Sequence, residues 1–189
     1  MRALLNCLLA ILFAVFHSWV SITDHPAVWT LDNFEDGDLR AASGLSWIVL
    51  GDDLMGGATE ARLELTSGAA ETPRHALRVA GRLGSGGFAG AWISLDSTGR
   101  SLDLSAFEGV RLRVKGPAAL DIGFRSGITN FMARVDAGPE WRLVEVPFDS
   151  MRPSAKAPEG AKFTSIEIRV PTEIHRERIE VELRDLPLK

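Results

Sequence analysis

The chain has 189 residues, of which 46% are hydrophobic and 24% are charged, and its formal net charge is -4. This composition is typical of one soluble globular domain with a sizeable core, and it excludes an intrinsically disordered chain. The negative net charge, with arginines interleaved among acids, argues against nucleic acid as a partner and against a polybasic membrane patch.

The first 21 residues differ in character from the rest of the chain. Arg2 is followed by an uncharged apolar run over residues 3–16, the arrangement of a secretory signal. The best cleavage point follows Ser21, but bulky Trp19 stands where a small residue is preferred, so an uncleaved signal anchor is the alternative. We therefore predict an exported protein that is periplasmic, extracellular or held in the membrane by this segment.

The remaining residues are predicted to form one domain. Residues 22–27 are a short linker, and residues 28–189 contain no internal repeat and no composition break. The only cysteine, Cys7, lies in the leader, so the domain cannot be held together by disulfides or by a thiolate zinc site.

Hydrophobic residues of the domain recur with a period of two. In "VRLRVKG", for example, Val110, Leu112 and Val114 alternate with basic residues. Such alternation is typical of strands with one buried face, and stretches such as "TSG", "GSGG" and "KGP" are typical of turns. Strands are predicted near residues 28–34, 45–50, 60–66, 75–82, 87–95, 109–115, 119–125, 130–136, 141–147, 163–170 and 178–185. The predicted fold is an all-β antiparallel sandwich.

The first acidic group lies in "LDNFEDGDL". Its members Asp32, Glu35 and Asp36 would approach Asp185 if the first and last strands pair. Carboxylate oxygens are the ligands that calcium prefers, so a calcium site is one interpretation. Solvated loop acids without any cofactor are the ordinary interpretation.

The stretch "GDDLMGG" precedes the strand near residue 60. Asp52 and Asp53 could share a proton or bind a cation, but the sequence offers no partner carboxylate at a spacing that such chemistry requires. The simpler interpretation is a turn, in which aspartates accept backbone hydrogen bonds and Gly56 and Gly57 adopt dihedrals that other residues avoid. Together with Met55 these residues are also candidates for lining a groove.

Four further residues are candidates for a ligand-binding face: Trp92, Asp121, Arg125 and Trp141. A tryptophan within a strand more often belongs to the core, and a ring exposed on a sheet is the alternative. The exposure of Trp92 therefore discriminates between a sugar platform and a scaffold residue.

Several motifs together resemble one family. "DNFEDG", "GDDLMGGATEARL", "GGFAGAWISL", "LDLSAFEGVRLRVKG", "WRLVEVPF" and "IEVELRDLPL" occur in the order of the complex I intermediate-associated protein 30 family, over roughly residues 29–186. The resemblance implies a galactose-binding-like jelly-roll related to carbohydrate-binding modules. It also implies a non-catalytic protein that acts as an assembly factor for the membrane-bound respiratory NADH dehydrogenase.

The chain departs from the family pattern at three places. A G-D-G-x-x-Y segment is replaced by "KGPAALDIGF", the arginine after the "GGFAS" turn is missing from "GGFAGAWISL", and no R-G-R-like loop is evident in "DSMRPSAKAPEGAK". These departures affect the inherited partner surface more than the fold.

Three functions remain open from the sequence. The leading hypothesis is a non-enzymatic interaction module that docks protein partners, as an assembly or chaperone factor for membrane complexes. The alternative is an exported carbohydrate-binding module. A hydrolase is third, because the sequence offers no nucleophile, base and orienting group that can be named together.

Overall fold

The computed structural model describes residues 28–67, 75–85, 87–116, 119–153, 162–171, 179–184 and 187–188. The predicted leader and linker lie outside these residues. Within the part of the chain that is described, no helix is long and apolar enough to cross a bilayer.

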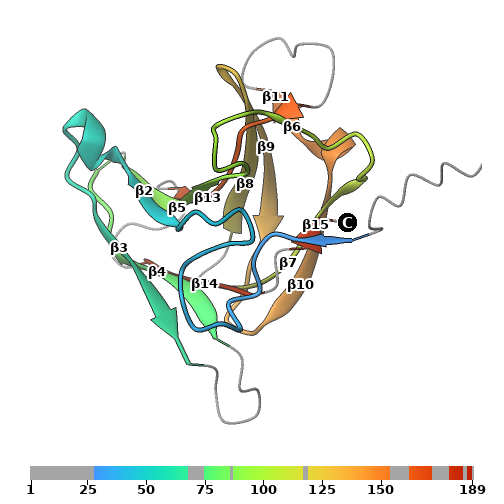
Figure 1. Ribbon diagram of the computed structural model, residues 1–189. Helices are drawn as coiled ribbons and strands as arrows, with labels where there is room; N and C mark the ends of the chain where they lie inside the picture. Colours follow the sequence, from blue (N-terminus) through green and yellow to red (C-terminus); the bar gives the residue numbers. More distant parts are fainter. Residues whose placement is uncertain are drawn as a thin grey trace, which may run out of the picture.

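One layer of the fold is a seven-stranded antiparallel sheet (Figure 1). Its strands follow the order β1, β15, β7, β14, β4 and β3, and β10 pairs with the free side of β7. The bounds are β1 Trp29–Thr30, β3 Glu60–Thr66, β4 Ala76–Arg82, β7 Gly109–Lys115, β10 Arg142–Pro147, β14 Ile179–Arg184 and β15 Pro187–Leu188.

The second layer is a six-stranded antiparallel sheet in the order β11, β9, β8, β13, β5 and β2. The bounds are β2 Ile48–Gly51, β5 Phe88–Ser94, β8 Ala119–Ser126, β9 Thr129–Asp136, β11 Arg152–Pro153 and β13 Ser165–Pro171. A two-stranded sheet joins β6 Leu102–Asp103 to β12 Lys162–Phe163, and the 3₁₀ turns η1 Asp52–Met55 and η2 Phe148–Ser150 complete the described elements. The prediction of an all-β antiparallel sandwich is confirmed.

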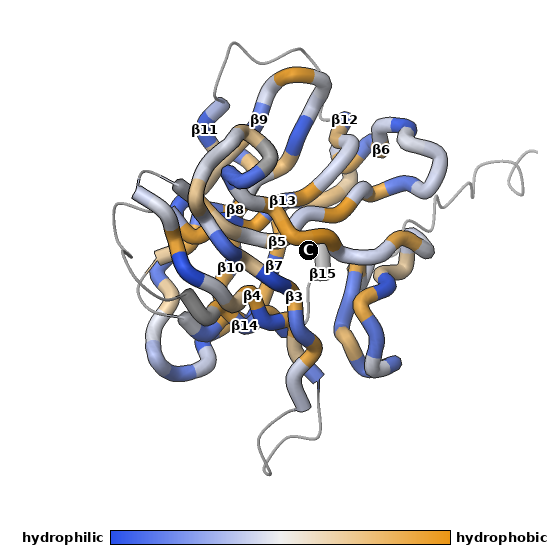
Figure 2. Tube along the Cα trace, turned by 90° about the vertical axis from the view of Figure 1, so that its left-hand side faces the viewer, coloured by the Kyte–Doolittle hydropathy of each residue, from blue (hydrophilic) through white to orange (hydrophobic). Residues whose placement is uncertain are grey.

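The alternating pattern of the sequence explains how the two layers pack. Along the strands, hydrophobic and hydrophilic residues follow one another in short steps (Figure 2). Alternate side chains of a strand point to opposite faces of its sheet, so each sheet turns its hydrophobic side inward. The core formed between them includes Leu77, Val79, Leu112, Val114, Val181 and Leu183 from one layer and Ala91, Ile93, Ile122, Phe124, Ile166 and Ile168 from the other.

Four phenylalanines fill one end of the core. Phe124, Phe131, Phe148 and Phe163 come from β8, β9, η2 and β12, and neighbouring ring centroids lie 5.2–5.7 Å apart. Tilted and edge-to-face contacts at this distance are favourable beyond the apolar area that they bury. This cluster attaches the two-stranded sheet to the sandwich.

The predicted strand at residues 28–34 is wrong beyond Thr30. The carboxylate of Asp32 accepts a hydrogen bond from the backbone N–H of Phe34 at 2.8 Å, and Phe34 has a φ of 57°. A side chain that bonds the backbone two residues ahead favours a turn over a strand. The described chain therefore leaves the sheet after β1.

Candidate functional site

The stretch "GDDLMGG" forms the tight connection between β2 and β3. Residues 52–55 make the turn η1, and Gly56 ends it with a φ of 80°. The N–H groups of Gly56 and Gly57 donate to the carbonyl oxygens of Asp53 and Asp52 at 3.0 and 2.9 Å. A positive φ is strained for residues with a side chain, which explains the glycine at position 56.

The side chain of Asp52 joins this turn to the connection between β4 and β5. Its Oδ1 accepts from the N–H of Thr59 at 3.2 Å, and the hydroxyl of Thr59 accepts from the N–H of Gly84 at 3.1 Å. A Cβ atom at Gly87 would overlap both the Asp52 carboxylate and the Thr59 hydroxyl. Within this packing, the Asp52 carboxylate acts as an acceptor for the backbone N–H of Thr59.

The other two candidates of this stretch are placed differently. Asp53 is exposed, and the Met55 side chain, at 75% exposed, is among the most exposed large hydrophobic groups of the described residues. Ile48 and Val49 on the adjacent β2 are also exposed. These exposed apolar side chains form a rim along the β2 edge of the six-stranded sheet, where Ile48 stands opposite Trp92 and Val49 opposite Ala91.

The predicted calcium ligands are only partly brought together. Asp32 is 6% exposed, and its Oδ2 accepts from the indole N–H of Trp47 at 2.9 Å while its Oδ1 accepts from Phe34. Burial raises the pKa of Asp32 to about 6, and repulsion from Asp36 and Asp38 adds to the rise. Glu35 and Asp36 are exposed, and Asp185 lies outside the described residues.

The described residues contain no group of three or more His, Cys, Asp or Glu side chains placed to hold a metal ion. Because Asp185 is not among them, the calcium site stays a prediction. Both oxygens of Asp32 already accept hydrogen bonds from the protein.

Three of the four predicted ligand-face residues lie together, on the side of the six-stranded sheet turned away from the core. Trp92 on β5, and Asp121 and Arg125 on β8, each stand opposite a residue of the intervening strand β13. We call this side the outer face; its residues include Trp92, Asp121, Gly123, Arg125, Asn130, Met132, Arg134, Arg152, Ser165, Glu167 and Arg169.

Trp141 does not belong to the outer face. It precedes β10 in the seven-stranded sheet, and the guanidinium carbon of Arg184 on β14 lies 4.3 Å from its ring centroid. The ring therefore makes a cation–π contact on the opposite side of the molecule.

The centre of the outer face is a row of residues that crosses the sheet. Opposite Glu167 of β13 stand Trp92 on one side and Gly123 on the other, and Gly123 faces Met132 of β9. A Cβ atom at Gly123 would overlap the sulfur of Met132, so the flexible methionine side chain lies on the glycine. Glu167 is thus set between Trp92 and Met132.

Only one oxygen of the Glu167 carboxylate accepts a hydrogen bond from the described residues. Glu167 is 2% exposed, and its Oε2 accepts from the Arg169 guanidinium at 2.9 Å. Within the described part of the chain, its buried Oε1 accepts no hydrogen bond, and the buried Nε of Arg169 donates none. Buried polar atoms without partners are uncommon in folded proteins, so each one calls for an explanation, such as a bound water, an ion or a ligand.

Other arginines of the outer face contact neighbouring side chains. Arg134 holds Asp121 through two hydrogen bonds of 2.9 and 3.2 Å, and Arg125 donates to the side chain of Asn130 at 3.1 Å. The Arg169 guanidinium lies 4.9 Å from the ring centroid of Phe88. These contacts restrict the conformations of the long side chains on this face.

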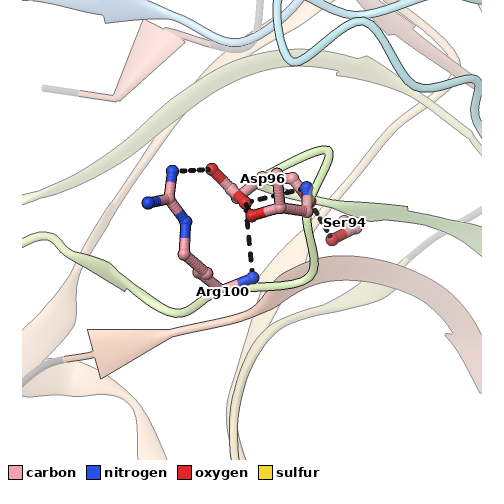
Figure 3. Close-up of polar contacts among 4 residues, drawn as sticks. Ser94, Asp96 and Arg100 are labelled. Carbon is pink, nitrogen blue, oxygen red and sulfur yellow. Dashed lines mark hydrogen bonds and ion pairs between the residues drawn. The ribbon is translucent and has the colours of Figure 1, made fainter.

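A turn after β5 fixes one end of the outer face (Figure 3). The hydroxyl of Ser94 donates to the backbone oxygen of Asp96 at 3.1 Å. It also lies within hydrogen-bonding distance, 3.2 Å, of the backbone oxygen of Thr164. The Asp96 carboxylate accepts from the side chain and N–H of Thr98 and from the Arg100 guanidinium, and these bonds hold the pKa of Asp96 well below its usual range.

Glu167, Arg169 and Met132 were not among the predicted site residues. In "IEIRV" the glutamate and arginine occupy the polar positions of an alternating strand, which usually face water. The available signal is that β13 lies between β8 and β5, so its polar side chains have neighbours on both sides. The central place of β13 follows from the strand order of the sheet, which cannot be derived from the alternation of residues.

Comparisons with known proteins agree with this architecture. The model of the complex I intermediate-associated protein 30 family matches residues 34–170. No curated protein matches the chain.

Solved structures of Clostridium thermocellum carbohydrate-binding modules share the fold. A family 11 module in complex with a β-1,3-1,4-mixed-linked tetrasaccharide has 17% identity and a TM-score of 0.61, over 85% of this chain and 94% of that chain. The family 11 module of a cellulosomal cellulase has 18% identity and the same TM-score, over 85% and 93% of the two chains. A family 30 module has 13% identity and a TM-score of 0.53, over 70% and 90%. At these identities the likeness establishes the fold alone.

Proposed function

The chain belongs to the complex I intermediate-associated protein 30 family, and from this premise we propose that it is a non-catalytic binding module that holds its ligand on the outer face of the six-stranded sheet. The observation that carries the proposal is the central row of that face. There a half-buried tryptophan adjoins a buried carboxylate with one free oxygen. Binding sites combine apolar or aromatic surface with a few fixed polar groups in this way.

A carbohydrate is the ligand class that this face suits best. Sugars present apolar ring faces and hydroxyl groups that both donate and accept hydrogen bonds, and the outer face offers Trp92 beside donors and acceptors. The solved structures that share the fold include a module in complex with a tetrasaccharide, which supports the same ligand class here.

Separate substitutions of Trp92 and Trp141 by alanine test this proposal. Trp92→Ala should weaken saccharide binding by roughly tenfold or more, because it removes the aromatic surface beside Glu167. Trp141→Ala, on the opposite sheet, is the matched control and should bind as the parent protein does. Binding is measured on a glycan array and by titration calorimetry at millimolar saccharide, with melting curves for both variants. Equal loss in the two variants, or no saccharide bound by the parent, would contradict the proposal.

A protein partner is the second candidate, favoured by the family and by the exposed rim of Ile48, Val49 and Met55. In this version the protein is an assembly or chaperone factor for membrane complexes, like the family's name-giving member. Cross-linking in intact membranes should then recover a partner that Met55→Ser reduces and Trp92→Ala does not. The opposite pattern would favour the outer face.

We also propose that the protein acts outside the cytoplasm. The motivation is the charged start and apolar run of residues 1–21. Fractionation and N-terminal sequencing decide between a cleaved leader and a membrane anchor, and recovery in the cytoplasm would refute both.

A further inference from the structure

Glu167 and Arg169 together offer a ligand one acceptor and one donor. The Glu167 Oε1 and the Arg169 Nε are both buried, and neither takes part in a hydrogen bond with the described residues. The remaining carboxylate oxygen and one terminal guanidinium nitrogen already bond to each other at 2.9 Å. The free positions are therefore adjacent, and they differ in hydrogen-bonding sense.

The charges of this pair are already compensated. Glu167 neutralises Arg169, and Asp121 neutralises Arg134 in the next row of the sheet. A ligand that carried a carboxylate would meet Glu167, and a cationic ligand would meet Arg169, so either charge would be opposed at the centre of the face. A neutral ligand with one donor and one acceptor on neighbouring atoms meets both free positions without such a conflict.

Building on the proposed function, we infer that Glu167 and Arg169 recognise two adjacent hydroxyl groups of a neutral saccharide. One hydroxyl donates to the Glu167 Oε1, and the other accepts from Arg169, while Trp92 contacts an apolar face of the sugar ring. Hydrogen bonds to charged partners are the stronger ones, so this pair selects for the diol.

In this arrangement Met132 is the side chain that controls access to Glu167. Its side chain lies on Gly123, directly across from Glu167, and methionine is the most adaptable of the apolar side chains. A ligand reaches Oε1 when the Met132 side chain changes its rotamer and no longer covers Gly123. The space above the glycine, beside the Glu167 carboxylate, is then open.

The test begins with a glycan array that carries neutral, acidic and amino saccharides, probed with the full chain. Neutral saccharides should be bound, and acidic and amino saccharides should not. Binding restricted to acidic saccharides would overturn the inference and point to Arg125 and Arg152 instead, while leaving the proposed function intact. Binding of no saccharide at all would remove the proposed function and the inference together.

The variant Glu167→Gln then tests the pair itself on the best neutral saccharide of the array. Arg169 orients the amide so that its oxygen faces the guanidinium, and an NH₂ donor replaces the free acceptor. Binding should fall by roughly ten- to a hundredfold. The matched control, Glu145→Gln, changes a strand glutamate paired with Arg111 on the other sheet and should leave binding unchanged. Unchanged binding by Glu167→Gln, with loss in Trp92→Ala, would overturn the inference alone.

A measurement on the unmutated chain covers the case in which Glu167→Gln does not fold. With the methionine methyl groups labelled with ¹³C, addition of the same saccharide should shift the Met132 resonance and leave that of exposed Met55 in place. An unchanged Met132 resonance at saturation would overturn the inference.

Discussion

The buried carboxyl group of Asp32 makes stability depend on pH. Its pKa is about 6 in the folded protein against 3.8 for the ordinary group, so between these values the folded state binds more protons than the unfolded chain. The free energy of unfolding therefore falls as the pH rises from about 4 to about 6, and it stays lower above that range. From the difference in pKa, the loss amounts to about 3 kcal/mol.

The variant Asp32→Asn should abolish this slope, because its amide does not titrate. The amide still accepts from Phe34 but presents NH₂ to the Trp47 indole, so at pH 4 the variant should be less stable by about 1–2 kcal/mol. Urea denaturation at several pH values between 4 and 7 measures both effects. An Asn variant with the full slope would assign the titration to another group.

Gly87 marks the contact between the two glycine-rich connections. Gly87→Ala should cost about 1–3 kcal/mol, because the added methyl group overlaps Asp52 and Thr59. Gly138→Ala is the control, since its Cβ would come no closer than 3.4 Å to another side chain, and its stability should change by less than about 1 kcal/mol. Thermal melting of both variants measures the difference.

A double variant identifies the cause of that loss. If overlap with the carboxylate is responsible, Asp52→Ala combined with Gly87→Ala should destabilise the protein by less than the sum of the single changes. Strict additivity would contradict the explanation.

At the scale of elements, the long strands were predictable and the short ones were not. The alternation in "VRLRVKG" and "IEIRV" extends over enough residues to identify β7 and β13. The strands β6, β11 and β12 have two residues each, which is too short for an alternating pattern. They form because the neighbouring elements bring their partners together.

The short strand β12 nevertheless contributes a central side chain. Phe163 is 4% exposed and lies against Phe124, Phe131 and Phe148. Phe163→Ala should cost about 3–5 kcal/mol, whereas Ile128→Ala, at the 97% exposed tip of the β8–β9 hairpin, should change stability by less than about 0.5 kcal/mol. Chemical denaturation measures the loss of stability in both variants. A similarly small loss in Phe163→Ala and Ile128→Ala would show that β12 is not an integral part of the core.

At the scale of the whole molecule, the sequence predicted the layers but only part of the outer face. Trp92, Asp121 and Arg125 share that face, whereas Trp141 lies on the other sheet. Periodicity tells which residues of a strand point the same way, but it does not tell which strands are neighbours. The sequence did not predict Glu167 for a related reason. A polar residue in an alternating strand is expected to face water, but this glutamate is buried between the residues of the neighbouring strands.

We expect the folded domain to need no metal ion, since both oxygens of Asp32 are occupied by protein donors. Melting curves in EDTA and in millimolar calcium should then coincide. A rise in the melting temperature with calcium would instead support the acidic site that includes Asp185.

The pairing of β1 with β15 has a practical consequence for engineering. Trp29 stands opposite Leu188 in this pair. The two ends of the domain therefore leave it side by side, where the blue first strand meets β15 (Figure 1). A domain with neighbouring ends can be spliced into a surface loop of a carrier protein, or its ends can be joined and new ones opened elsewhere. Because both end strands belong to the seven-stranded sheet, either rearrangement would keep the new junction off the outer face.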